Sequence, residues 1–282
     1  MLQVNLAESH GPGPVNEDVV GYCAGAAWVI DGATGIGAAL LEEPSDAAWL
    51  ARRADRELRA LLGATPDLPT RDLLRAVAGA CRADFERLAR SAPSGDHEHP
   101  SAAFAMVREF SDRIEFCALA DCRVAYRDAA GEARLFGAAS LDRVEGRTIA
   151  LVTDILRTEP AIVPAELCER VLPQLRENRR LMNKPGGYWV LVTEPLAADH
   201  AAIATVPRHP GRSFAIASDS FLRLVELFGV ADPGDLLAAD EANSFDRWLG
   251  RLRDLEREEG SCRRFPRVKV HDDASFVHCT LR

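Results

Sequence analysis

The sequence predicts an α+β domain with antiparallel sheet in the middle and helices outside. Stretches rich in β-forming residues open and close the chain, and amphipathic helical patterns lie between groups of strands. The order is strands, two helices, strands, helices and a last strand, which does not alternate as a parallel βαβ fold does. The chain shows no internal repeat and no low-complexity linker, so we expect residues 1–282 to form a single domain.

The first half of the chain carries most of the expected strands. We expect strands at about 2–8, 18–23, 26–30, 102–110, 113–120, 122–127 and 133–136, and the pair within 113–127 resembles a meander. The capping signal Pro44-Ser45-Asp46 begins a helix that runs through Leu61, and a second helix begins near Thr70. A loop rich in Pro, Gly and His over 92–100 leads back to the strands.

The second half alternates helical and strand patterns. Residues 140–182 are expected to be mainly helix, broken by Pro160 and Pro164. Strands are expected at about 188–193, 201–206, 213–217 and 274–281, and helices at about 219–228 and 234–258.

Composition excludes several classes of protein. Of the 282 residues, 47% are hydrophobic and 27% charged, which is typical of a globular chain with a sizeable core. The formal net charge of -9 argues against nucleic acid as a partner, because phosphates favour clustered Lys and Arg. No stretch reaches the roughly 18 apolar residues of a membrane span, and the N-terminus lacks a basic, apolar leader. We therefore expect a cytoplasmic protein with no membrane partner.

The cysteines predict neither disulfides nor a thiol nucleophile. There are seven, an odd number without a CxxC pair, and several lie in apolar runs such as Phe116-Cys117-Ala118-Leu119. The C-x5-R spacing of a phosphate loop occurs at Cys81–Arg87 and Cys117–Arg123, but these cysteines fall within an expected helix and an expected strand. We expect reduced, structural cysteines.

Four segments share one pattern, an apolar strand that ends in an aspartate. They are Trp28–Gly32, Cys117–Asp121, Phe214–Asp219 and Val268–Asp273, and the acidic pair Glu17-Asp18 opens another predicted strand. A carboxylate at the rim of a core is costly unless something neutralises it, and only Asp121 has a basic residue close behind it, Arg123. If these strand ends converge, hard divalent cations with oxygen ligands would neutralise them.

Each aspartate also has a structural interpretation. Asp31-Gly32 is typical of a turn, Asp121 of a turn or a helix cap, and Asp219 of a helix N-cap because an apolar helical run follows it. Asp18 and Asp273 suit solvated positions or positions behind the ligands. Taken singly, none of them identifies a site.

Taken in order, the motifs resemble those of the metal-dependent protein serine/threonine phosphatases, the type 2C (PPM) family. The motifs are Asn16-Glu17-Asp18, Asp31-Gly32-Ala33-Thr34-Gly35, Ala120-Asp121-Cys122-Arg123, Ala217-Ser218-Asp219 and Asp272-Asp273-Ala274-Ser275. They are similar to the family's acidic pair, D-G-x-x-G, G-D-S-R, S-D-G and D-N-x-T/S patterns, and they span residues 9–281. The chain is thus identified as a divergent, bacterial-type member.

The resemblance implies a four-layer αββα sandwich of two antiparallel sheets flanked by helices, with two or three Mn²⁺ or Mg²⁺ ions in a cleft at one end. Carried over to this chain, Asp31 would bridge two ions. Glu17 and the Gly32 carbonyl would serve one ion, and Asp219 and Asp272 the other. Asp18 would hold the water shell, and Asp121 with Asp219 would match a looser third site.

The resemblance also implies a reaction and a partner. Water between two cations is acidified, and the resulting hydroxide attacks the phosphorus of phosphoserine or phosphothreonine. Asp31 and Asp219 would act through this water. The expected substrate is a phosphorylated protein, with a bacterial-type Ser/Thr kinase as its counterpart. Two alternatives stay open: a pseudo-phosphatase that serves as a binding or regulatory module, and a hydrolase of small phosphate esters.

The chain departs from the family where substrate phosphate is held. The family's phosphate-binding Arg has Gly13 in its place, and His10, Lys184 and Arg212 are the candidate replacements. The segment 179–189 suits either a loop that contacts phosphopeptide or a helix end, and we favour the helix end. Further departures keep the carboxylates: Ala33 where some members have His, Ala120 and Ser220 in place of Gly, and Asp273 in place of Asn. The prediction requires residues 31, 219 and 272 to meet without Lys or Arg between them.

Overall fold

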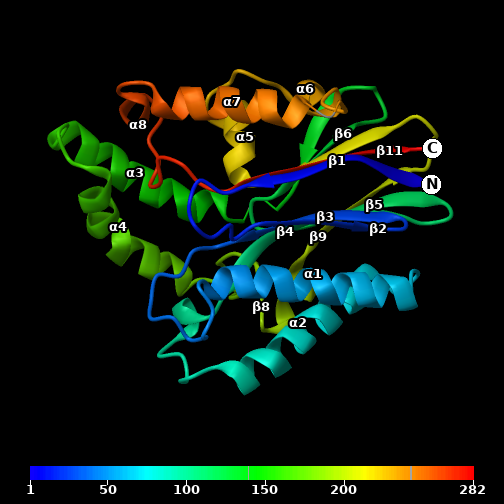
Figure 1. The fold of residues 1–282 in the computed structure, drawn as a ribbon, viewed down its shortest axis with the longest axis horizontal. Coiled ribbons are helices and arrows are strands. Elements are labelled where there is room, and N and C mark those ends of the chain that lie inside the picture. Colours follow the sequence, from blue (N-terminus) through cyan, green and yellow to red (C-terminus); the bar gives the residue numbers. More distant parts are fainter. Residues whose placement is uncertain (139, 242) are drawn as a thin grey trace.

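Two antiparallel sheets stack face to face, and helices cover their outer faces (Figure 1). The computed structural model describes residues 1–138, 140–241 and 243–282. The expected four-layer α+β sandwich is confirmed.

The first sheet has the strand order β1-β11-β10-β6-β7. These strands are β1 (Leu2–His10), β11 (Ala274–Leu281), β10 (Ser213–Ala217), β6 (Arg123–Arg127) and β7 (Ala133–Phe136). The second sheet has the order β2-β3-β4-β5-β9, and a short strand, β8, also pairs with β4. Its strands are β2 (Val19–Cys23), β3 (Ala26–Gly32), β4 (Ser101–Glu109), β5 (Arg113–Leu119), β8 (Leu191–Val192) and β9 (Ala202–Pro207).

The helices form the two outer layers and one end of the molecule. In Figure 1, α1 and α2 cover the second sheet, α5, α6 and α7 cover the first, and α3 and α4 lie at the end away from the chain termini. Their bounds are α1 (Asp46–Ala64), α2 (Thr70–Leu88), α3 (Asp142–Thr158), α4 (Pro164–Arg179), α5 (Asp219–Glu226), α6 (Pro233–Leu237), α7 (Ser244–Arg257) and α8 (Ser261–Arg264). Two short 3₁₀ helices, η1 (Asp96–Glu98) and η2 (Pro195–His200), lie in the connections.

Strand β3 shows why the core sequences are continuously apolar. Side chains alternate between the two faces of a strand, so Trp28 and Ile30 pack toward the α1 and α2 layer, whereas Ala27 and Val29 pack between the sheets. All four are fully buried. Only the last two residues of the strand, Asp31 and Gly32, break the apolar run, and they emerge at the end of the sandwich.

Three sequence predictions about the elements are wrong, and two of them concern strands. β5 and β6 do not form a meander, because β5 pairs with β4 and β9 whereas β6 pairs with β7 and β10 in the other sheet. The turn between them carries the chain across the sandwich. The segment 266–273 is irregular and precedes β11, so Asp272 does not end a strand.

The predicted helix at 234–258 is instead two helices, α6 and α7, and it spans residue 242, which lies outside the described residues. Pro233 and the Asp232 capping box begin the short α6. Among the described residues no helix is long and apolar enough to cross a membrane.

Candidate active site

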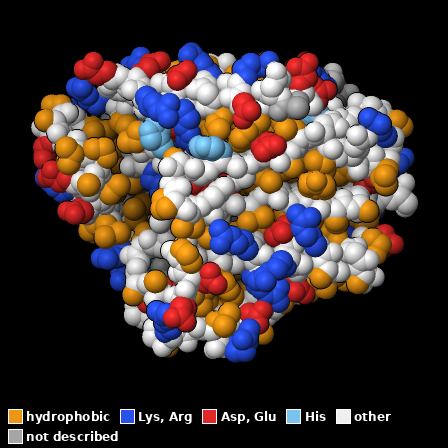
Figure 2. Space-filling model, in the orientation of Figure 1, with side chains coloured by type: hydrophobic (Ala, Val, Ile, Leu, Met, Phe, Trp, Pro, Cys, Tyr) orange, Lys and Arg blue, Asp and Glu red, His pale blue; other side chains and the backbone are white. Residues whose placement is uncertain are grey.

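Four of the predicted carboxylates line one cavity of about 740 Å³. Asp31, Asp121, Asp219 and Asp272 come from four separate parts of the chain. Helices α3 and α4 form an apolar wall of this cavity, with Val144 and Ile149 from α3 and Leu172 and Leu175 from α4. Figure 2 shows hydrophobic side chains gathered on the side of the molecule where these helices lie. The convergence expected from the sequence is therefore present in the fold.

The end of β3 brings two predicted ligand positions together. Asp31 lies opposite Ala103 of β4, so the sheet fixes its backbone. A Cβ atom at Gly32 would lie 2.5 Å from the carbonyl oxygen of Glu17, which is closer than real Cβ contacts come. Glycine is therefore required here, because the Glu17 backbone passes directly against it.

Turn and helix geometry place the next two aspartates. Asp121 follows Ala120, whose φ of 59° lies in the left-handed region that favours the glycine of the family pattern. Ser218 is the N-cap of α5, and Asp219 is the first residue of the helix. The N-cap interpretation of Asp219 is thus wrong, and its carboxylate lies where the positive end of the helix favours it.

Asp18 and Asp273 lie behind the cavity as internal hydrogen-bond acceptors. Asp18 is 6% exposed and accepts a hydrogen bond from the Ser275 hydroxyl at 2.7 Å. The carboxylate of Asp273 accepts the backbone N–H of Glu17 at 2.6 Å. These contacts tie the loop before β2 to the start of β11.

Electrostatics on the Asp31 side of the cavity show crowded, unneutralised acids. Burial, followed by the charges of Asp18, Asp219, Asp121 and Asp272, raises the pKa of Asp31 well above its ordinary value. Burial and the charge of Asp219 raise the pKa of Asp121 to about 7, although Arg123 acts in the opposite direction. Burial also raises the pKa of Asp18 to about 8, and nearby acids add to the effect. Acids in this condition favour a bound cation.

The Asp272 side of the cavity already contains a cation, Lys269. Its ammonium donates to Asp272 Oδ1 at 2.9 Å and to Thr34 Oγ1 at 2.8 Å. The hydroxyls of Thr34 and Ser45 both donate to the carboxylate of Glu17. Burial acts to lower the pKa of Lys269, but Asp272 and then Glu17 and Asp31 raise it above its ordinary value, so the ammonium is charged. The sequence prediction required residues 31, 219 and 272 to meet without Lys or Arg between them, and Lys269 contradicts it at Asp272, whereas Arg223 lines the same cavity and interacts with the charge of Asp219.

A buried ion cluster holds the irregular segment that carries Asp272. Arg253 donates to the Asp272 carbonyl at 2.6 Å, and Arg267 donates to the Val270 carbonyl at 3.2 Å. Arg253 also pairs with Glu256 of α7 at 2.7 Å. Side chains thus replace the hydrogen bonds that a strand would have supplied.

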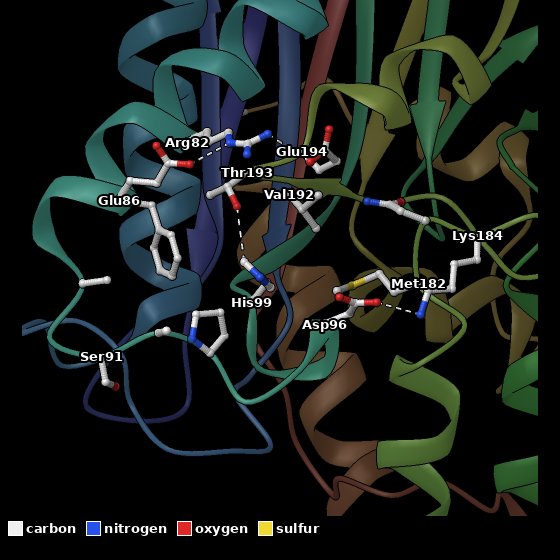
Figure 3. A pocket seen from close by; sticks show the side chains of 15 residues that line it. Arg82, Glu86, Ser91, Asp96, His99, Met182, Lys184, Val192, Thr193 and Glu194 are labelled. Carbon is white, nitrogen blue, oxygen red and sulfur yellow. Dashed lines mark hydrogen bonds and ion pairs between the residues drawn. The ribbon is translucent and has the colours of Figure 1, made fainter.

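Two of the three candidate phosphate-holding residues lie away from the carboxylates. Lys184 pairs with Asp96 at 2.6 Å on the rim of a different cavity, of about 620 Å³ (Figure 3). Arg212 lines a third cavity beside Gly131. His10 is exposed at the end of β1, opposite Ala274. Gly13 is exposed, with no atom within 4 Å of where its Cβ would be.

Lys269 is a site residue that the sequence analysis did not single out, and Arg179 entered it only as the first residue of the segment 179–189. Arg179 lines the carboxylate cavity and donates to the carbonyls of Ala33 at 3.1 Å and Thr34 at 2.8 Å. As expected, α4 ends at this position. Lys269 lies three residues before Asp272, and the apolar residues on both sides of it suggested a strand rather than a site.

The donor atoms in the cavity suit hard divalent ions. Asp31, Asp121 and Asp219 offer only oxygen donors, and the raised pKa values of Asp31 and Asp121 mark a shortage of positive charge, which fits Mn²⁺ or Mg²⁺. Within residues 1–138, 140–241 and 243–282, no group of three or more His, Cys, Asp or Glu side chains is ready to hold a metal ion. The carboxylates therefore share a cavity without forming a preassembled ligand set.

Comparison with known proteins identifies the fold. No family model matches the sequence, and no curated protein matches it. The serine/threonine phosphatase PstP/Ppp of Mycobacterium tuberculosis aligns over 100% of this chain and 99% of its own, with a TM-score of 0.61 and 16% identity. The alignment with the catalytic domain of PstP in complex with two manganese ions covers 99% of this chain and 97% of that domain, with a TM-score of 0.57 and 16% identity.

A further match is the PPM Ser-Thr phosphatase MsPP of Mycobacterium smegmatis, in complex with cacodylate. It aligns over 99% of both chains with a TM-score of 0.53 and 18% identity. The chain therefore has, over its whole length, the fold of bacterial PPM Ser/Thr phosphatases, although its sequence is only 16–18% identical to these three structures.

Proposed function

We propose that this protein is a metal-dependent phosphatase that hydrolyses phosphoserine or phosphothreonine in proteins. The observation that carries the proposal is the convergence of Asp31, Asp121, Asp219 and Asp272 on one cavity. The raised pKa values of Asp31 and Asp121 support it, because a fold gains no stability from crowding unpaired carboxylates. The PstP structure with two manganese ions supports the choice of metal.

Different residues of the cavity would hold the metal ions, the loop beside the phosphate and the substrate side chain. Asp31, Asp121 and Asp219 would hold divalent ions, with Glu17, Asp272 and the Gly32 carbonyl as further donors and Asp18 behind them. When bound, the ions would lower the pKa of water and offset the charge of the phosphoryl oxygens. Arg179 would hold the loop at Ala33 and Thr34 in place beside the phosphate. The cavity's apolar wall would exclude water from the substrate side chain.

Hydrolysis of p-nitrophenyl phosphate and of a phosphothreonine peptide tests this proposal. We expect turnover with Mn²⁺ that chelator abolishes, and we expect Asp219→Asn to lose about 10²-fold or more of it. Turnover that persists in chelator would contradict the metal mechanism. A kinase of the bacterial Ser/Thr type would supply the physiological phosphoprotein.

A second candidate function is a pseudo-phosphatase that binds partners without turnover. The pairing of Lys269 with Asp272 favours it, because an ammonium occupies part of the acidic cluster. Gly13 favours it as well, because glycine cannot grip phosphate as arginine does. No turnover with any divalent metal, combined with retained binding of a phosphopeptide, would support this alternative.

A further inference from the structure

Lys269 is unusual both in this chain and in this cavity. The sequence contains 34 Lys and Arg residues, of which only Lys184 and Lys269 are lysines. Lys184 forms an exposed pair with Asp96 elsewhere, whereas Lys269 contacts a predicted metal ligand, Asp272. An ammonium is a compact charge on a flexible stem, unlike the planar guanidinium.

The contacts of Lys269 are those that a cation in the cavity would make. Its ammonium contacts Asp272 Oδ1 at 2.9 Å and Thr34 Oγ1 at 2.8 Å, and Thr34 in turn donates to Glu17. Within the described ranges, no other side chain donates to the Asp272 carboxylate. The backbone N–H of Asp273 also donates to Asp272 Oδ1, at 3.1 Å.

The ion pair between Lys269 and Asp272 is partly exposed to water. The Lys269 side chain is 38% exposed and that of Asp272 is 29% exposed, so water reaches both partners. Exposed ion pairs of this kind are weak, and a lysine stem reorients with little cost. By contrast, the carbonyl of Asp272 is fixed by Arg253, so the acid would stay in place when the ammonium moves.

We propose that Lys269 is an internal counter-ion that competes with a divalent cation for Asp272. The proposal rests on the proposed metal-dependent function and adds a regulatory feature to the same site. With little metal, the ammonium offsets the charge of Asp272 and Glu17 and stabilises the metal-free fold. Metal binding on this side requires its displacement, so the Asp272 side fills at higher metal concentration than the Asp31 side.

Mn²⁺ titration of Lys269→Met by calorimetry tests the competition. Methionine keeps the apolar stem and removes the charge, so we expect Kd for the weaker ion to fall by about tenfold. Lys269→Arg retains the charge and should stay within about threefold of the wild-type Kd. Lys184→Met is the matched control for loss of a lysine, and its Kd should equal that of the wild type. An unchanged Kd in Lys269→Met would overturn the proposal.

A second measurement follows the Lys269 ammonium directly in the wild-type protein. Reductive ¹³C-methylation labels both lysines, and their methyl signals can be assigned with the Lys184→Met and Lys269→Met variants. Mg²⁺ should shift the Lys269 signal as the ammonium leaves Asp272, whereas the Lys184 signal should stay unmoved. A Lys269 signal that stays in place while the ion binds would count against competition.

The outcomes separate this proposal from the phosphatase proposal. Tighter Mn²⁺ binding by Lys269→Met without turnover in any variant would support the counter-ion and contradict the phosphatase. Metal-dependent turnover with equal Kd values in all variants would support the phosphatase and contradict the counter-ion. Absence of Mn²⁺ binding in every variant would contradict both.

Discussion

Glu256 and Asp31 are acids that the same fold treats in opposite ways. The Glu256 side chain is fully buried and contacts Arg223 at 2.6 Å, Arg253 at 2.7 Å and His271 at 2.8 Å. Burial would raise the pKa of Glu256, but His271, Arg253 and Arg223 together lower it below its ordinary value. Asp31 meets other acids instead, and its pKa rises well above its ordinary value.

The difference distinguishes structural charge from functional charge. The Glu256 cluster pairs its own charges and holds segment 266–273, whereas the acids around Asp31 repel one another unless protons or a bound cation offset their charge. Arg223 lies on α5 one turn after Asp219, and it connects the two clusters. Removing an acid should therefore have opposite effects on stability in the two places.

The largest expected effect is on catalysis by Asp31→Asn. This change removes an oxygen charge from the centre of the acidic cluster, so Mn²⁺-dependent turnover should fall by about a thousandfold. The metal-free protein should become more stable, by about 1–2 kcal/mol, because one buried repulsive carboxylate is lost. Steady-state kinetics and urea denaturation in chelator measure the two effects.

The control for Asp31→Asn is Asp112→Asn, an exposed aspartate that pairs with Arg113. It should change neither activity nor stability measurably. If Asp31→Asn lowered metal-free stability, Asp31 would be a structural acid like Glu256, and the comparison would fail.

Glu256→Gln should have the next largest effect, on stability. It leaves Arg223 and Arg253 buried without a counter-ion, so the free energy of unfolding should fall by about 3–5 kcal/mol. Urea denaturation measures the loss. Glu258→Gln changes an exposed acid near the end of α7 and is the matched control. A loss below about 0.5 kcal/mol would show that solvent reaches the arginines.

Metal-free stability should decrease as the pH rises from 5 to 8. The native state keeps protons on Asp18 up to about pH 8 and on Asp121 up to about pH 7, whereas their ordinary pKa is 3.8. The native state therefore binds more protons than the unfolded chain in this window, and the free energy of unfolding should fall by several kcal/mol.

Urea denaturation at several pH values in chelator measures this trend. Asp18→Asn should flatten it, because the amide does not titrate. Saturating Mn²⁺ should also weaken it, because the ion takes the place of the protons. Stability that rises with pH in chelator would mean that these acids are neutralised by a group on the protein.

Much of the fold was predictable because the sequence patterns are local. The continuous apolar run of β3 and the Ser45 cap of α1 are set by neighbouring residues, and both were confirmed. The crossing of β5 and β6 between sheets was not predictable in this way, because it depends on the turn at Ala120, whose φ of 59° is unusual for alanine. Strand pairing is a property of distant segments, which periodicity does not encode.

The candidate site was predictable to a similar extent. The order of the motifs indicated that Asp31, Asp121, Asp219 and Asp272 would share one cavity, and the fold brings them together. Lys269 was missed because its flanking valines suggested a strand, whereas arginines from α7 and beyond hold this segment as a loop. The metal ligands themselves stay predictions.

The smallest expected effect concerns Lys184, a candidate for the missing phosphate-binding arginine. Lys184 Nζ lies 2.6 Å from Asp96 Oδ2, and the two side chains are 48% and 58% exposed. Both residues line a different cavity from the one that Asp31 lines. An exposed pair of this kind contributes little, so Lys184→Ala should change the free energy of unfolding by less than about 0.5 kcal/mol and kcat/KM by less than about twofold. A large rise in KM alone would show that the substrate extends across both cavities, and Lys184 would then belong with the functional charges. If Lys184→Ala lowered only the free energy of unfolding, the pair would resemble the Glu256 cluster, whose charges stabilise the fold.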